Sequence, residues 1–172
     1  MAGSLVKIDE EIVSSAVASV TLTGIDSTYD VYQIIVNNLQ CDTDVEDLKC
    51  RVTESGTPNT TANYDRASKL IRAGSSFVNQ FATNETNWDM GTNIGTGTGE
   101  GMQVLMYIFN ANNSSEYTFH TKENVEFNST PELLGQQGGG VFTSASSVDG
   151  ISFFMETGNI DAGTFVLYGL KK

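Results

Sequence analysis

Short runs of alternating apolar and polar residues constrain the fold more than any other feature of this chain. The alternation occupies residues 18–23 and recurs at 48–53 and 117–122. Because successive side chains of a strand point to opposite faces, such runs indicate strands with one buried face. Abundant Gly and only 17% charged residues favour tight turns over solvated helices. We expect an all-β fold, a jelly-roll-like antiparallel β-sandwich of eight or nine strands.

No composition change marks a linker, so residues 1–172 are expected to form a single domain with a short N-terminal arm, about residues 1–15. Residues 64–73 fit either a short helix or an irregular strand. Residues 83–101, which carry Trp88, and the glycine-rich residues 135–140 are expected to be loops.

Two parts of the second half make specific predictions about burial. Residues 102–110 are apolar on both faces, so this strand should be covered on both sides or packed against another subunit. The closing strands, 150–155 and 163–170, should turn four large side chains into the core. These are Ile151, Phe153, Phe165 and Leu167.

The net charge of −12 and the scattered basic residues disfavour nucleic acid and anionic membranes as partners. The N-terminus lacks the pattern of a signal peptide, and no apolar segment is long enough to span a membrane. We therefore expect folding in a cytosol, with Cys41 and Cys50 as free thiols rather than a disulfide.

Two segments invite catalytic interpretations that their surroundings do not support. His120 is the single histidine, but no Gly-x-Ser-x-Gly motif supplies a nucleophile, so a solvated or interface position is expected. The glycine run 95–101 precedes a strand rather than a helix and lacks the Lys-Ser/Thr of a phosphate loop.

Metal and cofactor sites are equally weak in the sequence. The acidic residues 42–47 lack the turn glycine and later bidentate Glu of a calcium loop, and a solvated turn is the simpler interpretation. Two Cys and one His cannot complete a structural zinc site, and Cys50 fits a small core residue. We predict no catalytic, cofactor-binding or metal residue.

Carbohydrate chemistry stays open as an alternative. Several carboxylates could meet in space, as a glycoside hydrolase requires, and three aromatic residues could line a sugar-binding surface instead of the core or an interface. The carboxylates are Asp89, Glu100, Glu116, Glu123, Glu126 and Glu132, and the aromatic residues are Tyr64, Trp88 and Tyr107.

The two ends of the chain resemble known proteins. The stretch from Ala18 to Asn38 and the stretch from Gly150 to Leu170, with its closing Gly-Thr-Phe-Val-Leu-Tyr-Gly, are similar to small virion structural proteins of tailed bacteriophages, especially those of marine and cyanobacterial hosts. The resemblance implies a jelly-roll-like module that decorates the phage head or forms part of a tail fibre, and it implies no catalytic residue.

The expected function is therefore a capsid decoration or cement protein, not an enzyme, in a virion assembled in the host cytoplasm. Its expected partners are the major capsid protein or other virion proteins and further copies of itself, in a trimer or ring. The alternative is a tail-fibre tip or adaptor that binds host surface glycans. A small glycan-cleaving enzyme is the third possibility.

Overall fold

The computed structural model describes residues 4–171, which form thirteen strands in two packed antiparallel sheets. This confirms the β-sandwich, with thirteen strands rather than eight or nine. The described residues contain no helix that could cross a membrane. The strands are β1 Leu5–Val13, β2 Val20–Thr23, β3 Val31–Cys41, β4 Glu46–Glu54, β5 Thr57–Pro58, β6 Tyr64–Arg72, β7 Val78–Glu85, β8 Trp88–Ile94, β9 Gly101–Phe109, β10 Thr118–Phe127, β11 Leu133–Phe142, β12 Gly150–Met155 and β13 Ile160–Leu170.

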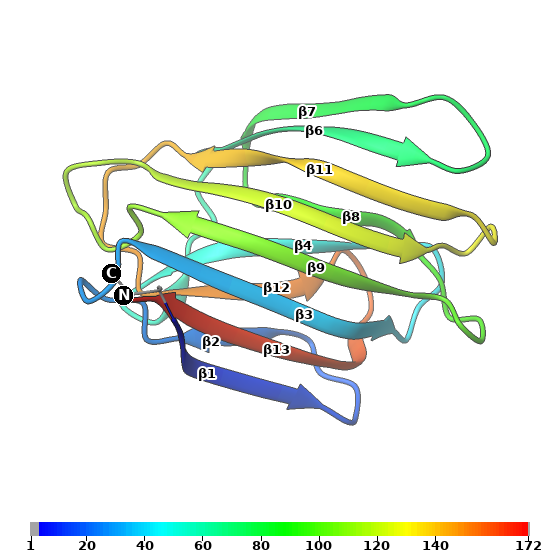
Figure 1. Ribbon diagram of the computed structural model, residues 1–172, viewed down its shortest axis with the longest axis horizontal. Coiled ribbons are helices and arrows are strands. Elements are labelled where there is room, and N and C mark those ends of the chain that lie inside the picture. Colours follow the sequence, from blue (N-terminus) through cyan, green and yellow to red (C-terminus); the bar gives the residue numbers. More distant parts are fainter. Residues whose placement is uncertain (1–3, 172) are drawn as a thin grey trace.

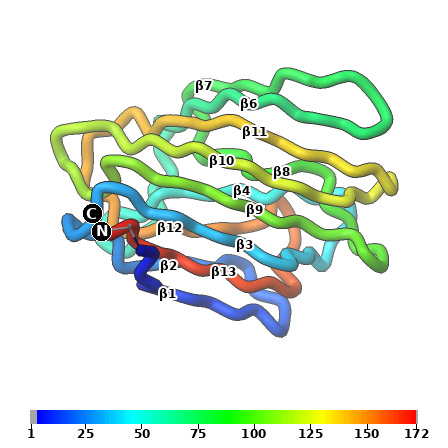
Figure 2. The backbone as a smooth tube through the Cα atoms, in the orientation of Figure 1, coloured from blue at the N-terminus to red at the C-terminus, as the bar shows by residue number. Residues whose placement is uncertain are grey.

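The larger sheet has eight strands in the order β1-β13-β3-β9-β10-β11-β6-β7 (Figure 1). The smaller sheet has the order β2-β12-β4-β5, with β8 pairing β4. In Figures 1 and 2 the smaller sheet lies behind the larger one. We call the face of the eight-stranded sheet that points away from the smaller sheet the outer face.

The apolar core fills the space between the two sheets. The four C-terminal residues predicted to be in the core are all fully buried, Ile151 and Phe153 on β12 and Phe165 and Leu167 on β13. The rings of Phe153 and Phe165 lie 5.5 Å apart between centroids, so the two strands contact each other across the sandwich. This confirms the predicted facing of the C-terminal strands.

Strand β9 lies between β3 and β10 in the larger sheet, and only one of its two apolar faces is covered by the smaller sheet. Its inward side chains, from Met102 to Ile108, are buried in the core. Its outward side chains, from Gln103 to Phe109, are half-buried on the outer face. The expected cover is thus present on the core side, and no further layer of residues 4–171 lies over the outer face.

One open alternative of the sequence analysis is decided by the structure, and two segments differ from the expectation. Residues 64–72 form strand β6, so the strand interpretation of this segment is correct. Trp88 begins strand β8 and is fully buried, rather than lying in a loop. Residues 135–140 lie within β11, paired on both sides with β10 and β6, rather than in a flexible loop. Pairing with distant strands, which local propensity does not encode, orders these segments.

The expected N-terminal arm is also corrected in its described part. Strand β1 pairs with β13 from Leu5, opposite Leu170, to Val13, opposite Gly163. These residues therefore form an edge strand of the larger sheet and belong to the sandwich. Residues 1–3 of the expected arm lie outside the described residues.

Candidate functional site

Strand β10 has the reverse of the usual amphipathic pattern. Its inward-facing side chains are all polar and all less than 9% exposed. Its outward-facing residues include Phe119, Val125 and Phe127, which are 42–47% exposed. Core burial normally selects the opposite arrangement, so both faces of β10 need a physical explanation. The inward-facing residues are Thr118, His120, Lys122, Asn124 and Glu126.

The buried polar groups of β10 face strand β8, not the apolar core. Lys122 is 4% exposed, and its ammonium donates hydrogen bonds to the Asp89 carbonyl oxygen, at 2.7 Å, and to the Gln136 side-chain oxygen. The Gln136 amide in turn donates to the side-chain oxygen of Gln80. Burial lowers the pKa of Lys122 to about 8, an effect that the nearby Asp89 carboxylate partly opposes.

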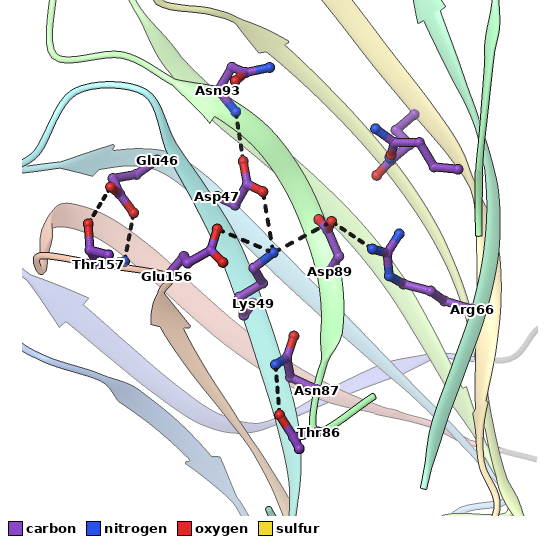
Figure 3. A network of polar contacts seen from close by, with 12 residues as sticks. Glu46, Asp47, Lys49, Arg66, Thr86, Asn87, Asp89, Asn93, Glu156 and Thr157 are labelled. Atoms are coloured by element: carbon purple, nitrogen blue, oxygen red, sulfur yellow. Dashed lines mark hydrogen bonds and ion pairs between the residues drawn. The ribbon is translucent and has the colours of Figure 1, made fainter. Parts of the chain in front are cut away.

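An ion-pair network extends from Asp89 toward the surface (Figure 3). One Asp89 carboxylate oxygen lies 3.2 Å from the Arg66 guanidinium and 3.7 Å from the Lys49 ammonium. Lys49 also lies 3.3 Å from an Asp47 oxygen and 3.7 Å from a Glu156 oxygen. The network thus joins β6 of the larger sheet to β4 and β8 of the smaller sheet.

Glu126 is the most perturbed carboxyl group of this region. Its side chain is 2% exposed, and burial raises its pKa to about 8. The Asn124 amide donates a hydrogen bond to one Glu126 oxygen at 3.3 Å. The other Glu126 oxygen, one Asp89 carboxylate oxygen and the side-chain amide oxygen of Asn124 have no hydrogen-bond partner within residues 4–171. A protonated Glu126 could donate a hydrogen bond, which an ionised one cannot.

The inward-facing polar side chains of β10 and the groups that they contact on β8 form what we call the polar layer. His120 packs beside Trp88 in this layer. The two ring centroids are 4.3 Å apart, and the His120 side chain is 3% exposed. Burial, together with the positive charge of Lys122, lowers the pKa of His120 to about 3. His120 is therefore a neutral interior residue, which corrects the solvated or interface position expected from the sequence.

The structure brings together only two of the six carboxylates considered for glycoside hydrolysis. Asp89 and Glu126 approach each other in the interior, where both are less than 9% exposed. Glu123 accepts a hydrogen bond from Gln137, and Glu132 binds Arg72. Glu100 and Glu116 lie elsewhere, next to Gly101 and in the turn that precedes β10. The pair that meets is thus buried between the sheets rather than exposed in a cleft.

The other candidates have structural contacts. Glu100 accepts a hydrogen bond from the Gly97 backbone, which folds the glycine run back on itself. In the acidic segment 42–47, Asp42 accepts two hydrogen bonds from Asn159, and Glu46 is buried against Thr157. Within the described residues no group of three His, Cys, Asp or Glu could hold a metal ion.

Both cysteines are buried and free, as expected. Burial raises the pKa of Cys41 to about 11, with nearby carboxylates adding to the effect. Burial also raises the pKa of Cys50, which lies in the core as predicted. Both groups are therefore protonated thiols, which are poor nucleophiles and poor metal ligands.

The outer face carries an apolar patch, which we define as Ile71, Val125, Phe127 and Leu133. Each side chain of the patch is 42–50% exposed. The register places Val125 and Ile71 on either side of Gly135, and Phe127 directly opposite Leu133, so the four belong to adjoining strands β6, β10 and β11. Because Gly135 has no side chain, the centre of the patch is open.

Two hollows adjoin each other on the outer face. The larger has a volume of about 470 Å³ and is lined by Leu105, Tyr107, Thr121, Glu123 and Gln137, among others. The second, of about 340 Å³, shares Leu105 and Glu123 and reaches Val125 of the apolar patch. Of the aromatic residues considered for sugar binding, Tyr64 and Trp88 are core residues, whereas Tyr107 lies on the outer face.

Comparison with protein-family models and with curated proteins finds no match. The polar layer ties the two sheets together with groups that are buried from solvent. The outer face, in contrast, presents apolar side chains to solvent. Sequence reasoning does not single out Lys122, Gln136 or Arg66. For Lys122 there is a signal in the sequence, because period-two alternation places it on the same strand face as His120.

Proposed function

We propose that the protein is a structural component of a tailed-bacteriophage virion, a head decoration protein that binds the major capsid protein through its outer face. The apolar patch carries this proposal. Ile71, Val125, Phe127 and Leu133 expose large apolar side chains side by side on neighbouring strands. Contiguous exposed apolar surface on a folded protein marks an interaction site, because covering it removes that surface from water.

The chemistry of the chain favours a protein surface as the partner. The net charge of −12 opposes binding to nucleic acid and to anionic membranes. The apolar patch itself contains no charged residue, so a protein partner could cover it without desolvating a charge. The resemblance of both chain ends to small phage virion proteins supports the same class of partner.

The buried polar layer supports a structural role rather than catalysis. Three groups of β10 with strongly shifted pKa values, Lys122, Glu126 and His120, are all less than 5% exposed. A general acid or base must come within hydrogen-bond reach of its substrate. These side chains instead face β8 and hold the larger sheet to the smaller one.

A tail-fibre tip or adaptor that binds host glycans is the second candidate, and the larger hollow of the outer face favours it. Tyr107 lines this hollow, and its hydroxyl oxygen accepts a hydrogen bond from the Gln33 amide at 2.7 Å. The Gln137 amide donates to Glu123 at 2.7 Å on the same surface. An aromatic ring beside paired amide and carboxylate groups is suited to a sugar ring, which presents both apolar and hydroxyl surface.

Locating the protein on virions separates the two functions. Antibody-labelled protein should appear over the whole head in electron micrographs, in many copies per particle. Label confined to the tail, in a few copies, would contradict head decoration and support the glycan-binding alternative. Binding of purified protein to host envelope glycan, together with failure to bind capsids that lack it, would support the same conclusion.

A further inference from the structure

The two edges of the eight-stranded sheet differ in chemistry. At one edge, β1 carries Lys7, Asp9, Glu10 and Glu11, and its register with β13 shifts between Lys7 and Asp9. Charges and irregular register are the devices by which proteins prevent edge strands from pairing with other chains. The β1 edge is therefore protected.

The opposite edge has less of this protection: the register of β7 with β6 shifts between Ala82 and Glu85, but the rest of the edge is regular and uncharged. Residues 73–84, which lead into and form most of β7, contain no charged residue and no proline. Among the described strands β7 pairs only with β6, so its other side presents backbone donors and acceptors outward. Phe77 and Phe81 are 61% and 77% exposed, and most side chains of β7 are exposed. Figure 1 shows β7 at the upper margin of the sheet.

We propose that β7 pairs antiparallel with β7 of a second copy of this chain, which joins two larger sheets into one continuous sheet. Antiparallel pairing of identical strands follows a two-fold axis perpendicular to the sheet, so each copy offers the same surface to the other. An axis at Phe81 places the two Phe81 rings opposite each other. It also places Asn79 opposite Thr83 of the second copy, so that polar side chains face one another.

The charge distribution favours this edge as the contact between two copies. Each chain carries a net charge of −12, so two copies repel each other over most of their surfaces. The uncharged segment 73–84 is a long stretch where close approach brings no like charges together. Pairing of β7 with the β1 edge of another copy is disfavoured, because Asp9, Glu10 and Glu11 would lie along the apolar edge, whereas the two-fold pairing brings only Glu85 to each end of the paired stretch, opposite Phe77.

The two-fold axis has a consequence for the outer face. Because the axis is perpendicular to the sheet, the outer faces of both copies point to the same side. The apolar patches of two copies would then lie on one surface. The proposed dimer does not depend on the proposed function, because the pairing of β7 requires no capsid.

Sedimentation of the purified protein tests the pairing with a matched pair of variants. Phe81→Lys places charge at the two-fold axis, whereas Ile12→Lys places it at the β1 edge on a residue of similar exposure, 68%. The parent and Ile12→Lys should be dimers. Phe81→Lys should melt like the parent but have a dimer dissociation constant raised at least tenfold. A monomeric parent, or equal association of the two variants, would overturn the proposal.

Cross-linking tests the register. Cys41 and Cys50 are buried, so Phe81→Cys adds a readily accessible thiol. Mild oxidation should link Phe81→Cys chains into covalent dimers and leave Ile12→Cys chains monomeric. A mixture of Asn79→Cys and Thr83→Cys chains should cross-link, whereas each variant alone should not. Equal cross-linking of Phe81→Cys and Ile12→Cys would contradict pairing through β7.

Discussion

The imidazole ring of His120 packs against the indole ring of Trp88, with the ring centroids 4.3 Å apart and both side chains buried. This contact joins β10 of the larger sheet to β8 of the smaller sheet. It requires His120 to be neutral, because a charged imidazolium in this position would have lost its hydration. The contact therefore couples the packing of the two sheets to pH.

His120 should make the protein sensitive to acid. Its pKa falls from 6.5 to about 3 on folding, so between these values the unfolded chain binds a proton that the folded chain does not. Its contribution to stability is complete above pH 6.5 and is lost as the pH falls toward 3. We expect a loss of up to about 5 kcal/mol in the free energy of unfolding, at roughly 1.4 kcal/mol per pKa unit. Denaturant melts at a series of pH values give the free energy of unfolding of the parent and of His120→Gln. Between pH 3 and 6.5 this free energy should fall more steeply with decreasing pH in the parent, and equal pH dependence of the two proteins would contradict the assignment.

Glu126 should have the opposite pH dependence. Its pKa rises from 4.5 to about 8 on folding, so the folded chain keeps a proton that the unfolded chain releases. Its contribution to stability is complete below pH 4.5 and is lost as the pH rises toward 8. Glu126→Gln, which stays neutral, should remove this slope and be the more stable protein at pH 8. A variant less stable than the parent at pH 8 would show that ionised Glu126 is well solvated or paired.

Gly140 should tolerate no side chain. A Cβ atom there would lie 2.5 Å from the Asp65 carbonyl oxygen, 2.6 Å from His120 Cε1 and 2.8 Å from Trp88 Nε1. Gly140→Ala should therefore destabilise the protein by about 1–3 kcal/mol through overpacking. Gly135→Ala is the matched control on the same strand, because its Cβ would make only ordinary contacts at 3.6 Å and beyond. Equal melting temperatures for the two variants would contradict the tight packing at Gly140.

Phe165 should contribute strongly to stability. Its ring is fully buried and contacts Phe153 across the sandwich. Phe165→Ala should cost about 3–5 kcal/mol in the free energy of unfolding. Phe119→Ala, at a side chain that is 44% exposed, should cost much less. Thermal or denaturant melts measure both, and a Phe165→Ala protein that melts like the parent would mean that this side chain is not in the core.

The sequence predicted the parts of the fold where local alternation and burial agree. Ile151 and Phe165 lie in strands whose apolar residues face the core, and simple periodicity located them. Strand β10 alternates just as clearly, but its apolar residues face outward. Alternation identifies the two faces of a strand, but it does not show which face is buried when either one could lie against the other sheet.

The remaining differences have a common physical origin. The glycines of residues 138–140 resemble a loop in the sequence, but they form the part of β11 that leaves room for bulky neighbours such as Trp88 and His120. Trp88 lies in a polar stretch whose strand character depends on pairing with β4. The polar layer is assembled from strands far apart in the chain, so local sequence does not reveal which groups meet.

Binding of the purified protein to capsids that lack it, compared between Val125→Lys and Val45→Lys, tests the proposed function most directly. Val125 is 47% exposed in the apolar patch, and Val45 is 54% exposed outside it, so both variants should fold like the parent. A lysine at position 125 must be desolvated on docking, whereas one at position 45 stays in water. We predict that Val125→Lys loses at least tenfold in capsid affinity while Val45→Lys binds like the parent. Equal binding of the two variants would contradict docking through the outer face.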